Sequence, residues 1–223
     1  MASRAELDAA SAAVAAVHPG FAALVEAHGP MRLRAPVPAA GRFEALARHV
    51  AYQQLAGAAA SAIWARVRAT AGDDPFDAGG VLARGEVPLR AAGLSGAKAA
   101  TVLALAAAVD DGSVRLTRIG RLADDEVVAQ LTTVRGIGPW TAQMFCLFDL
   151  HRLDVWPTGD YGVRVGFGLA TAMPATPTPA ELGRAGEPFR PYRSVAAWYS
   201  WRAVEAARAD EPADVLAGPG SVG

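Results

Sequence analysis

Cysteine is nearly absent from this chain of 223 residues, which carries only Cys146. A single cysteine excludes an intramolecular disulfide, a four-thiolate iron–sulfur cluster and a cysteine-based zinc site. No run of about 18 apolar residues occurs, so no membrane span is expected. The first residues show no signal-peptide pattern, and we therefore expect a protein of the reducing cytoplasm.

Lysine is equally scarce, because Lys98 is the only lysine among the 21 basic residues. With 22 acidic residues the formal net charge is −1, which by itself does not indicate a nucleic-acid-binding protein. The charge is unevenly spread. Residues 31–70 carry six arginines and one glutamate, and residues 184–208 carry five arginines and two glutamates. These segments form either a cationic face or ordinary solvated helix surfaces.

The composition favours a folded, helical protein. With 52% hydrophobic residues the chain is too apolar to be disordered, and its length fits one domain or two small ones that share a core. Alanine is abundant and apolar residues recur every three or four positions, which predicts an all-α fold. The expected N-caps are Ser95, Asp124 and Thr178. Helices are predicted over residues 5–17, 20–28, 43–69, 77–84, 88–92, 96–109, 125–134, 139–149, 160–170, 179–185 and 193–208, with a loose tail at 209–223.

A glycine-rich turn joins two of the predicted helices within residues 131–142. Gly136 and Gly138 flank Ile137, and glycine permits positive φ and close backbone approach. Ile137 is expected to fill the gap between the helices. The amides of Gly138, Trp140 and Thr141 then lie at a helix N-terminus, where an anion such as phosphate is favoured. An ordinary hairpin of two helices with a glycine turn is the alternative interpretation.

A loop with glycine and proline follows at residues 154–164 and brings Asp160 to the start of a helix. Asp160 is a candidate catalytic carboxylate. The alternative is a plain N-cap, the usual role of aspartate at that position. Asp154 is interpreted as a residue that caps or braces the loop.

The hairpin at 134–142, followed by this loop and Asp160, resembles the helix–hairpin–helix–Gly/Pro–Asp superfamily of DNA glycosylases, and within it the DNA-3-methyladenine glycosylase II type. Residues 49–55, 94–98 and 189–202 match further motifs, and the resemblance spans about 20–205. It implies one glycosylase domain over 1–208 with two helical subdomains flanking a cleft and no N-terminal β domain. One subdomain is expected to hold about 43–112 plus central helices through 170, and the other 1–42 with 171–208.

The resemblance also implies the chemistry. Members of this family flip a damaged base out of the duplex and hydrolyse its bond to deoxyribose. We expect a monofunctional DNA glycosylase that removes alkylated purines such as 3-methyladenine in base excision repair. Asp160 would stabilise the oxocarbenium-like sugar and orient or deprotonate water. Two alternatives remain: a glycosylase for another base lesion, or a non-catalytic DNA-binding module, which would have no need of Asp160.

Some relatives also cut the strand through a Schiff base formed by a lysine in the second helix of the hairpin. Trp140 occupies that position here, and Lys98 matches a different motif. We therefore expect no AP-lyase activity.

Several further residues receive roles from the resemblance. Trp140 and Trp201 are predicted to stack on the damaged base, with core packing as the alternative. Tyr52 is another candidate for the base pocket, and Met144 stands where a close relative has an aromatic residue.

Gln54 is predicted to fill the gap left by the flipped base, or else to be a solvent-facing helix residue. Gln53 is assigned to structure. The other expected DNA contacts are Gly136, Gly138, Trp140, Thr141 and Ser194, of which Ser194 alternatively caps the last helix. Tyr52, Trp156, Tyr161 and Trp198 are further aromatic candidates near the cleft, and for each of them a place in the core is favoured over the pocket.

The family's hairpin holds a monovalent cation, here predicted as Na⁺ or K⁺ on the backbone carbonyls of Thr132, Val134 and Gly136. No cofactor is expected to be required, and the single cysteine excludes the iron–sulfur cluster of endonuclease III relatives. The expected partner is double-stranded DNA with damaged bases, bound by a monomer without membrane contact. In a bacterium it would be nucleoid-associated.

Overall fold

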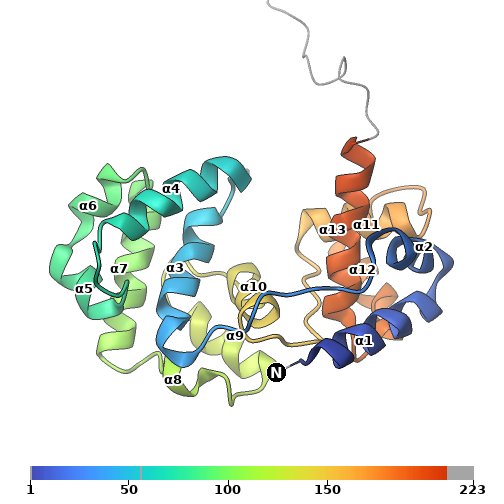
Figure 1. Ribbon diagram of the computed structural model, residues 1–223, viewed down its shortest axis with the longest axis horizontal. Helices are drawn as coiled ribbons and strands as arrows, with labels where there is room; N and C mark the ends of the chain where they lie inside the picture. The colour runs from blue at the N-terminus through green and yellow to red at the C-terminus, as the bar shows by residue number, and fades with distance from the viewer. Residues whose placement is uncertain (1, 56, 210–223) are drawn as a thin grey trace, which may run out of the picture. The chain divides into compact units, whose positions relative to one another are not determined.

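A computed structural model describes residues 2–55 and 57–209, and every regular element within them is a helix (Figure 1). The predicted all-α class is therefore confirmed. The helices form two compact units. Unit 1 is Leu33–Arg152, and unit 2 combines Ala2–Arg32 with the chain from Leu153 onward.

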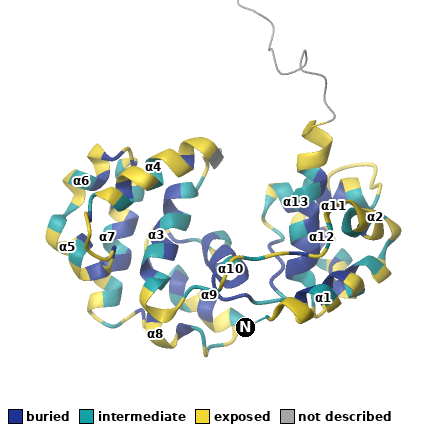
Figure 2. Ribbon diagram, in the orientation of Figure 1, coloured by how far each residue is buried: buried dark blue, intermediate teal, exposed yellow. Residues whose placement is uncertain are grey.

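Unit 1 is built around three helices, α3 (Arg42–Tyr52), α7 (Gly96–Asp110) and α10 (Pro139–Phe148). Figure 2 shows buried residues along all three helices, and Val50, Leu105 and Phe145 are fully buried. Burying each such side chain contributes roughly 2 kcal/mol. The predicted cap of α7 is confirmed, since Ser95 Oγ accepts from the Lys98 amide at 3.3 Å. The remaining elements of unit 1 are η1 (Ala39–Gly41), α4 (Gly57–Ala69), α5 (Ala78–Arg84), α6 (Glu86–Ala91), α8 (Leu116–Ile119) and α9 (Asp124–Thr132).

Unit 2 has an aromatic core. The rings of Phe21 and Phe189 lie 4.8 Å apart, and Phe167 lies 5.7 and 5.8 Å from them. The buried Tyr199 donates its hydroxyl proton to the Gly29 carbonyl oxygen at 2.8 Å. This bond ties the last helix to the end of the second. The elements of unit 2 are α1 (Arg4–Val17), α2 (Pro19–His28), α11 (Tyr161–Ala170), α12 (Pro179–Ala185), η2 (Glu187–Phe189) and α13 (Arg193–Ala209).

The prediction of one helix over residues 43–69 is wrong. Helix α3 ends at Tyr52, Gln53 is extended at ψ 130°, and Gln54 has a positive φ of 54°. The Lys98 ammonium donates to the carbonyl oxygens of Ala51 (2.8 Å) and Gln53 (2.6 Å). A continuous helix would have used both carbonyls for its own bonds. Lys98, which binds these two carbonyls, is distant in sequence, and the local pattern does not reveal the contact.

The division into units also differs from the expected subdomains. Residues 153–170 belong to unit 2, because α11 packs along α13. Residues 33–42 belong to unit 1, where the Val37 amide donates to the Asp149 carbonyl oxygen at 3.1 Å.

Two helix ends differ from prediction as well. The N-cap of α9 is Ala123 rather than Asp124, and its amide donates to the Glu126 carboxylate at 2.7 Å. Ala209 still belongs to α13, and the rest of the predicted tail, 210–223, lies outside the described residues.

Candidate functional site

The turn between α9 and α10 in unit 1 requires glycine at only one of its two glycine positions. Gly136 has φ 92°, and a Cβ there would lie 1.9 Å from Thr101 Oγ1. A side chain at this position is thus excluded by both conformation and space. Ile137 is 3% exposed and fills the interior of the hairpin, as predicted.

Gly138 is different. Its φ of −93° and ψ of 173° are open to any residue, and a Cβ would meet no atom within 4 Å. The fold of the free protein therefore does not demand a glycine here, and its bare backbone keeps the surface at the start of α10 open. Gly138 is the N-cap of α10 and offers no side-chain cap, and Pro139 at the first helical position has no N–H. The first turn of α10 thus has the amide and dipole arrangement that favours an anion.

The turn between α3 and α4 is tied to this hairpin. Gln53 Nε2 donates to Thr141 Oγ1 at 2.8 Å and to the Gly136 carbonyl oxygen at 3.2 Å. The structural role assigned to Gln53 is therefore observed. Thr141 is 2% exposed, so its hydroxyl serves this internal bond and its side chain is not a surface contact. Gln54 projects from the exposed turn rather than from a helix.

The predicted pocket residues of unit 1 differ in accessibility. Trp140 and Tyr52 are half-buried, which leaves part of each ring on the surface. Met144 is 3% exposed and belongs to the core of unit 1. Trp140 and Tyr52 are therefore accessible to a ligand, whereas Met144 is not.

Asp160 caps α11 in unit 2 and holds a second partner at the same oxygen. Its Oδ1 accepts from the Val163 amide at 2.7 Å and from Trp201 Nε1 at 3.1 Å. Both hydrogen bonds converge on this one carboxylate oxygen. The two interpretations of Asp160 are therefore compatible, because the N-cap bond fixes a half-buried carboxylate that is joined to an indole predicted to bind the base.

Two glycines, to which the sequence alone assigned no role, bring these groups together. A Cβ on Gly162 would lie 3.0 Å from Trp201 Cδ1 and 3.2 Å from Asp160 Oδ1. A Cβ on Gly166 would lie 1.7 Å from the Ser200 carbonyl oxygen. Glycine at both positions lets α13 approach α11 closely enough for Trp201 to reach Asp160. Their four-residue spacing on one helix face was the available signal.

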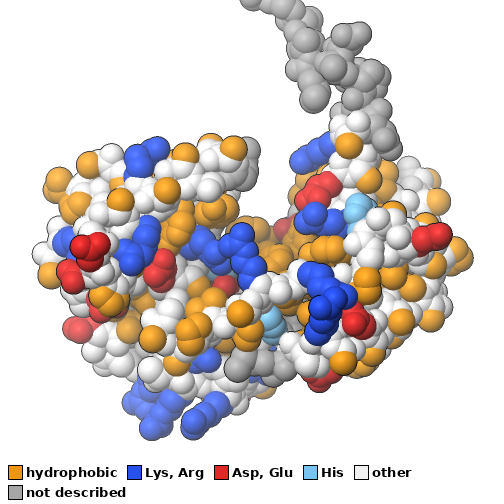
Figure 3. Space-filling view, viewed as in Figure 1, with side chains coloured by type: hydrophobic (Ala, Val, Ile, Leu, Met, Phe, Trp, Pro, Cys, Tyr) orange, Lys and Arg blue, Asp and Glu red, His pale blue; other side chains and the backbone are white. Residues whose placement is uncertain are grey.

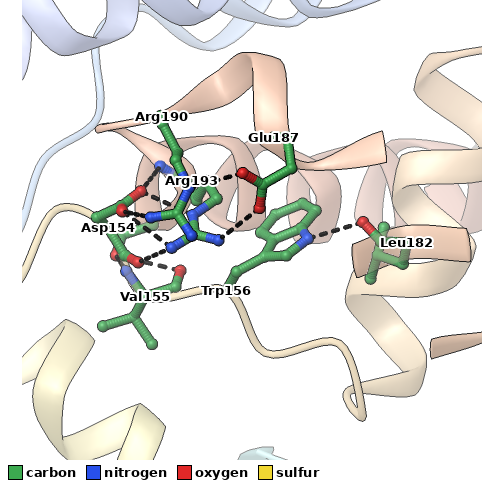
Figure 4. Close-up of polar contacts among 8 residues, drawn as sticks. Asp154, Val155, Trp156, Leu182, Glu187, Arg190 and Arg193 are labelled. Carbon is green, nitrogen blue, oxygen red and sulfur yellow. Dashed lines mark hydrogen bonds and ion pairs between the residues drawn. The ribbon is translucent and has the colours of Figure 1, made fainter. Parts of the chain in front are cut away.

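The loop that leads to Asp160 is anchored by ion pairs (Figure 4). Asp154 accepts from Arg193 Nε at 2.8 Å and Nη2 at 2.9 Å, and from Arg190 Nη1 at 2.7 Å. Glu187 pairs with both guanidinium groups, at 2.9 Å to Arg190 and 3.4 Å to Arg193. Asp154 therefore braces the loop, one of the two roles considered for it.

Ser194 is also part of this anchor. It is 1% exposed, its Oγ accepts from the Val155 amide at 2.9 Å, and its own amide donates to the Leu153 carbonyl oxygen at 3.0 Å. The expectation that Ser194 contacts DNA is corrected, because both groups are used to fasten the loop to the start of α13.

Three other aromatic residues complete the account of unit 2. Trp156 is buried as expected, and its Nε1 donates to the Leu182 carbonyl oxygen at 2.9 Å. Trp198 is half-buried, with the Arg202 guanidinium 4.9 Å from its ring centroid. Tyr161 is 69% exposed, so its expected place in the core is wrong.

The predicted cation ligands lie at the end of α9. The Val134 carbonyl oxygen accepts from the Ile137 amide at 3.0 Å, and that of Gly136 accepts from Gln53 at 3.2 Å. Each carbonyl oxygen has a second lone pair, and a helix C-terminus favours cations. These residues fit a monovalent cation. Among the described residues, no group of three or more His, Cys, Asp or Glu side chains is placed to hold a metal ion.

The arginines of residues 31–70 do not form a free cationic face. Five of the six bind carboxylates or backbone carbonyls within the described chain, namely Arg32, Arg42, Arg48, Arg66 and Arg68. Exposed basic side chains gather instead over α8 (Figure 3), where the residues are Arg115, Arg118 and Arg121. Within 2–55 and 57–209, no helix has the length and apolarity needed to cross a membrane.

Comparison with known proteins gives clear relatives, although no family model matches the chain. DNA-3-methyladenine glycosylase 1 of Schizosaccharomyces pombe is 32% identical over 172 residues, which cover 76% of this chain and 75% of the relative. The solved structure of 3-methyladenine DNA glycosylase from the same organism, in complex with abasic DNA, has a TM-score of 0.80 at 30% identity, covering 87% of this chain and 95% of that one. A DNA-3-methyladenine glycosidase structure from Bacillus halodurans has a TM-score of 0.77 at 28% identity, and the match covers 90% of this chain and 91% of that one.

Proposed function

Because the chain belongs to the DNA-3-methyladenine glycosylase family, we propose that it removes alkylated purines from double-stranded DNA by hydrolysing their N-glycosidic bonds. This reaction begins base excision repair. The observation that carries the proposal within the chain is the hydrogen bond between Asp160 and Trp201, which joins a carboxylate to an aromatic surface.

The reaction needs one negative group beside the sugar. When the bond between C1′ and the ring nitrogen breaks, its electron pair leaves with the base and the sugar becomes oxocarbenium-like. Asp160 stabilises that charge and directs a water molecule, whose oxygen binds C1′ while its proton is released. An N-alkylated purine is positively charged before cleavage and leaves as a neutral base, so no acid is required to protonate it.

Base recognition follows from the same charge. An electron-rich indole attracts a cationic base through cation–π stacking, worth about 0.5–2 kcal/mol. Trp201 is held by its bond to Asp160, so its ring orientation is fixed before the base arrives. Trp140 of unit 1 is the second tryptophan proposed to contact the base.

DNA binding is assigned to the hairpin and the adjoining turn of unit 1. The start of α10 binds a backbone phosphate through amides, which requires no lysine. Gln54, exposed in the turn fastened to that hairpin, enters the gap left by the flipped base.

The proposed reaction stops at base release. Trp140 has no amine with which to form a Schiff base, and the ammonium of Lys98 is bound to the Ala51 and Gln53 carbonyl oxygens. We therefore assign no strand cleavage to this protein.

A bound Na⁺ or K⁺ would be held by the carbonyls of Thr132, Val134 and Gly136. It would add positive charge beside the phosphate-binding end of the hairpin. Hydrolysis itself needs no cofactor, since water and Asp160 supply the reacting groups.

The proposal is tested by incubating the protein with duplex DNA that has been treated with a methylating agent, and separating the released bases by chromatography. Release of 3-methyladenine, with intact strands until alkali is added, is the expected result. Parallel duplexes with oxidised or deaminated bases identify a different lesion preference. Release of no base from any of these duplexes would overturn the proposal.

A further inference from the structure

We propose that Lys98 is a positioning residue for base excision, because its ammonium holds the turn of residues 53–55 in the conformation that presents Gln54 to DNA. The inference rests on the proposed function. It assigns a purpose to the only lysine of the chain, which the chemistry of base release does not use.

The first observation is the way in which the ammonium is bound. Lys98, on the first turn of α7, donates to the Ala51 carbonyl oxygen at 2.8 Å and to that of Gln53 at 2.6 Å. Hydrogen bonds from a charged donor are stronger than neutral ones. They engage the carbonyl of the residue directly before Gln54 and that of the residue three before it, and so they stop α3 from continuing through Gln54.

The second observation is the backbone of Gln54 itself. A φ of 54° is uncommon for a residue other than glycine and persists only where the surroundings impose it. The side chain of Gln54 is exposed. Gln54 therefore adopts an unfavourable backbone conformation although its side chain contributes nothing to the core. This is expected of a residue that acts on a ligand.

The third observation is that α7 supports the hairpin as well as the turn. Thr101, nearly one helical turn after Lys98, occupies the space beside Gly136, where a Cβ would lie 1.9 Å from its Oγ1. Gln53 connects the turn directly to the hairpin, because its side-chain amide donates to the Gly136 carbonyl oxygen and to Thr141. Lys98 thus fixes the turn in register with the hairpin that is assigned to bind phosphate.

A positioning role and a merely structural role differ in their dependence on the substrate. Gln54 matters most when the lesion is paired, because flipping it leaves a partner base facing a gap. A lesion opposite an abasic site has no such partner and is flipped at lower cost. A loss of Lys98 should therefore affect paired lesions selectively.

The experiment compares single-turnover excision of one alkylated purine, opposite its normal partner and opposite an abasic site, by the wild-type protein and by Lys98→Met. We expect about a tenfold slower excision of the paired lesion and little change for the unpaired one. Lys98→Arg, which keeps charged donors, should recover most of the rate. Arg118→Met, which removes an exposed cation elsewhere in unit 1, is the matched control. An equal loss on both substrates, or no loss on either, would overturn the proposal.

A double variant tests whether Lys98 acts through Gln54. If it does, Gln54→Ala with Lys98→Met should excise the paired lesion no more slowly than Gln54→Ala alone. If the double variant is slower than Gln54→Ala by the same factor by which Lys98→Met is slower than the wild type, the inference is contradicted.

A measurement on the wild-type protein keeps the proposal testable if Lys98→Met does not fold. Labelling lysine with ¹⁵N gives a single side-chain signal, which should show slow proton exchange and shift when lesion-containing duplex binds. Exchange as fast as that of a free ammonium would refute the contact. A wild-type protein that releases no base would instead overturn the proposed function, whatever the state of this signal.

Discussion

The indole Nε1 of Trp201 lies 3.1 Å from Oδ1 of Asp160, the same oxygen that accepts from the Val163 amide at 2.7 Å. One carboxylate oxygen therefore receives two donors, one from the first turn of its own helix and one from α13. This arrangement fixes the carboxylate before substrate binds, so little reorganisation is needed during the reaction. The role proposed for Asp160 predicts that the rate of base release depends on this hydrogen bond, which can be removed without removing an aromatic ring.

Replacing Trp201 by phenylalanine is the first test. The ring is kept and the donor to Asp160 is lost, so we expect base release to slow by about tenfold, the effect of one charge-assisted hydrogen bond. Single-turnover rates at saturating enzyme separate this effect from DNA affinity. Trp198→Phe, which changes a neighbouring indole that is stacked beside Arg202, serves as the control and should keep the wild-type rate. Equal rates for both variants would contradict the role given to the Trp201 N–H.

The two hairpin glycines should respond oppositely to alanine. Gly136→Ala must place a methyl group against Thr101 at a positive φ, and we expect it to lower the free energy of unfolding by roughly 2 kcal/mol or more. Gly138→Ala meets no atom and should change that free energy by less than about 0.5 kcal/mol while weakening duplex binding. Urea denaturation and DNA titration of both variants make the comparison. Tight duplex binding by Gly138→Ala would remove the start of α10 from the DNA interface.

The ion pairs of Asp154 with Arg193 and Arg190 should contribute unequally to stability and activity, because Arg193 is the more buried partner. The Arg193 side chain is 13% exposed and that of Arg190 is 50% exposed, although both bind the same carboxylate. Arg193→Met should lower the free energy of unfolding by about 1–3 kcal/mol and slow base release, because the loop it fastens ends at Asp160. Arg190→Met is the matched control and should have the smaller effect in thermal unfolding and in activity. The reverse order would show that the loop is held by other contacts.

Cys146 should report the unfolding of unit 1. Burial raises the pKa of its thiol from 9.0 to about 12, so at pH 8 the folded protein exposes no thiolate to an alkylating reagent. Labelling should follow global unfolding. Above pH 9 the unfolded chain loses this proton while the folded chain retains it, so the thiol makes folding stability decrease as the pH rises from 9 towards 12. Rapid labelling of the native protein at pH 8, measured by mass spectrometry, would contradict the burial of this residue.

The sequence was informative where a motif is local and less so where a contact is distant. The hairpin, Asp160 and its cap all lie within short segments whose spacing predicts their structure. At the break between α3 and α4 the carbonyls are bound by Lys98, more than forty residues away, and helix periodicity cannot predict this contact. Ser194 stands at a helix start, where a surface contact with phosphate was a reasonable expectation. Its burial depends on the docking of the 153–157 loop, which is a tertiary event.

The glycines of α11 are a further case in which a distant contact, rather than the local sequence, explains a residue. Gly162 and Gly166 look like weak points of a helix when helix propensity alone is considered. In the folded chain they are the positions that let α13 approach, so that Trp201 meets Asp160. Propensity describes the isolated helix, whereas the contact between Asp160 and Trp201 depends on the pair of helices.

Asp160→Asn tests whether the Asp160 carboxylate carries the chemistry of base release. Asparagine keeps an oxygen that can accept from Val163 and Trp201, so the cap and the local structure are preserved while the negative charge is lost. Single-turnover release of an alkylated purine should be compared with the affinity for the same duplex. The account predicts a rate at least about 100-fold lower with wild-type affinity. Base release at the wild-type rate would contradict it.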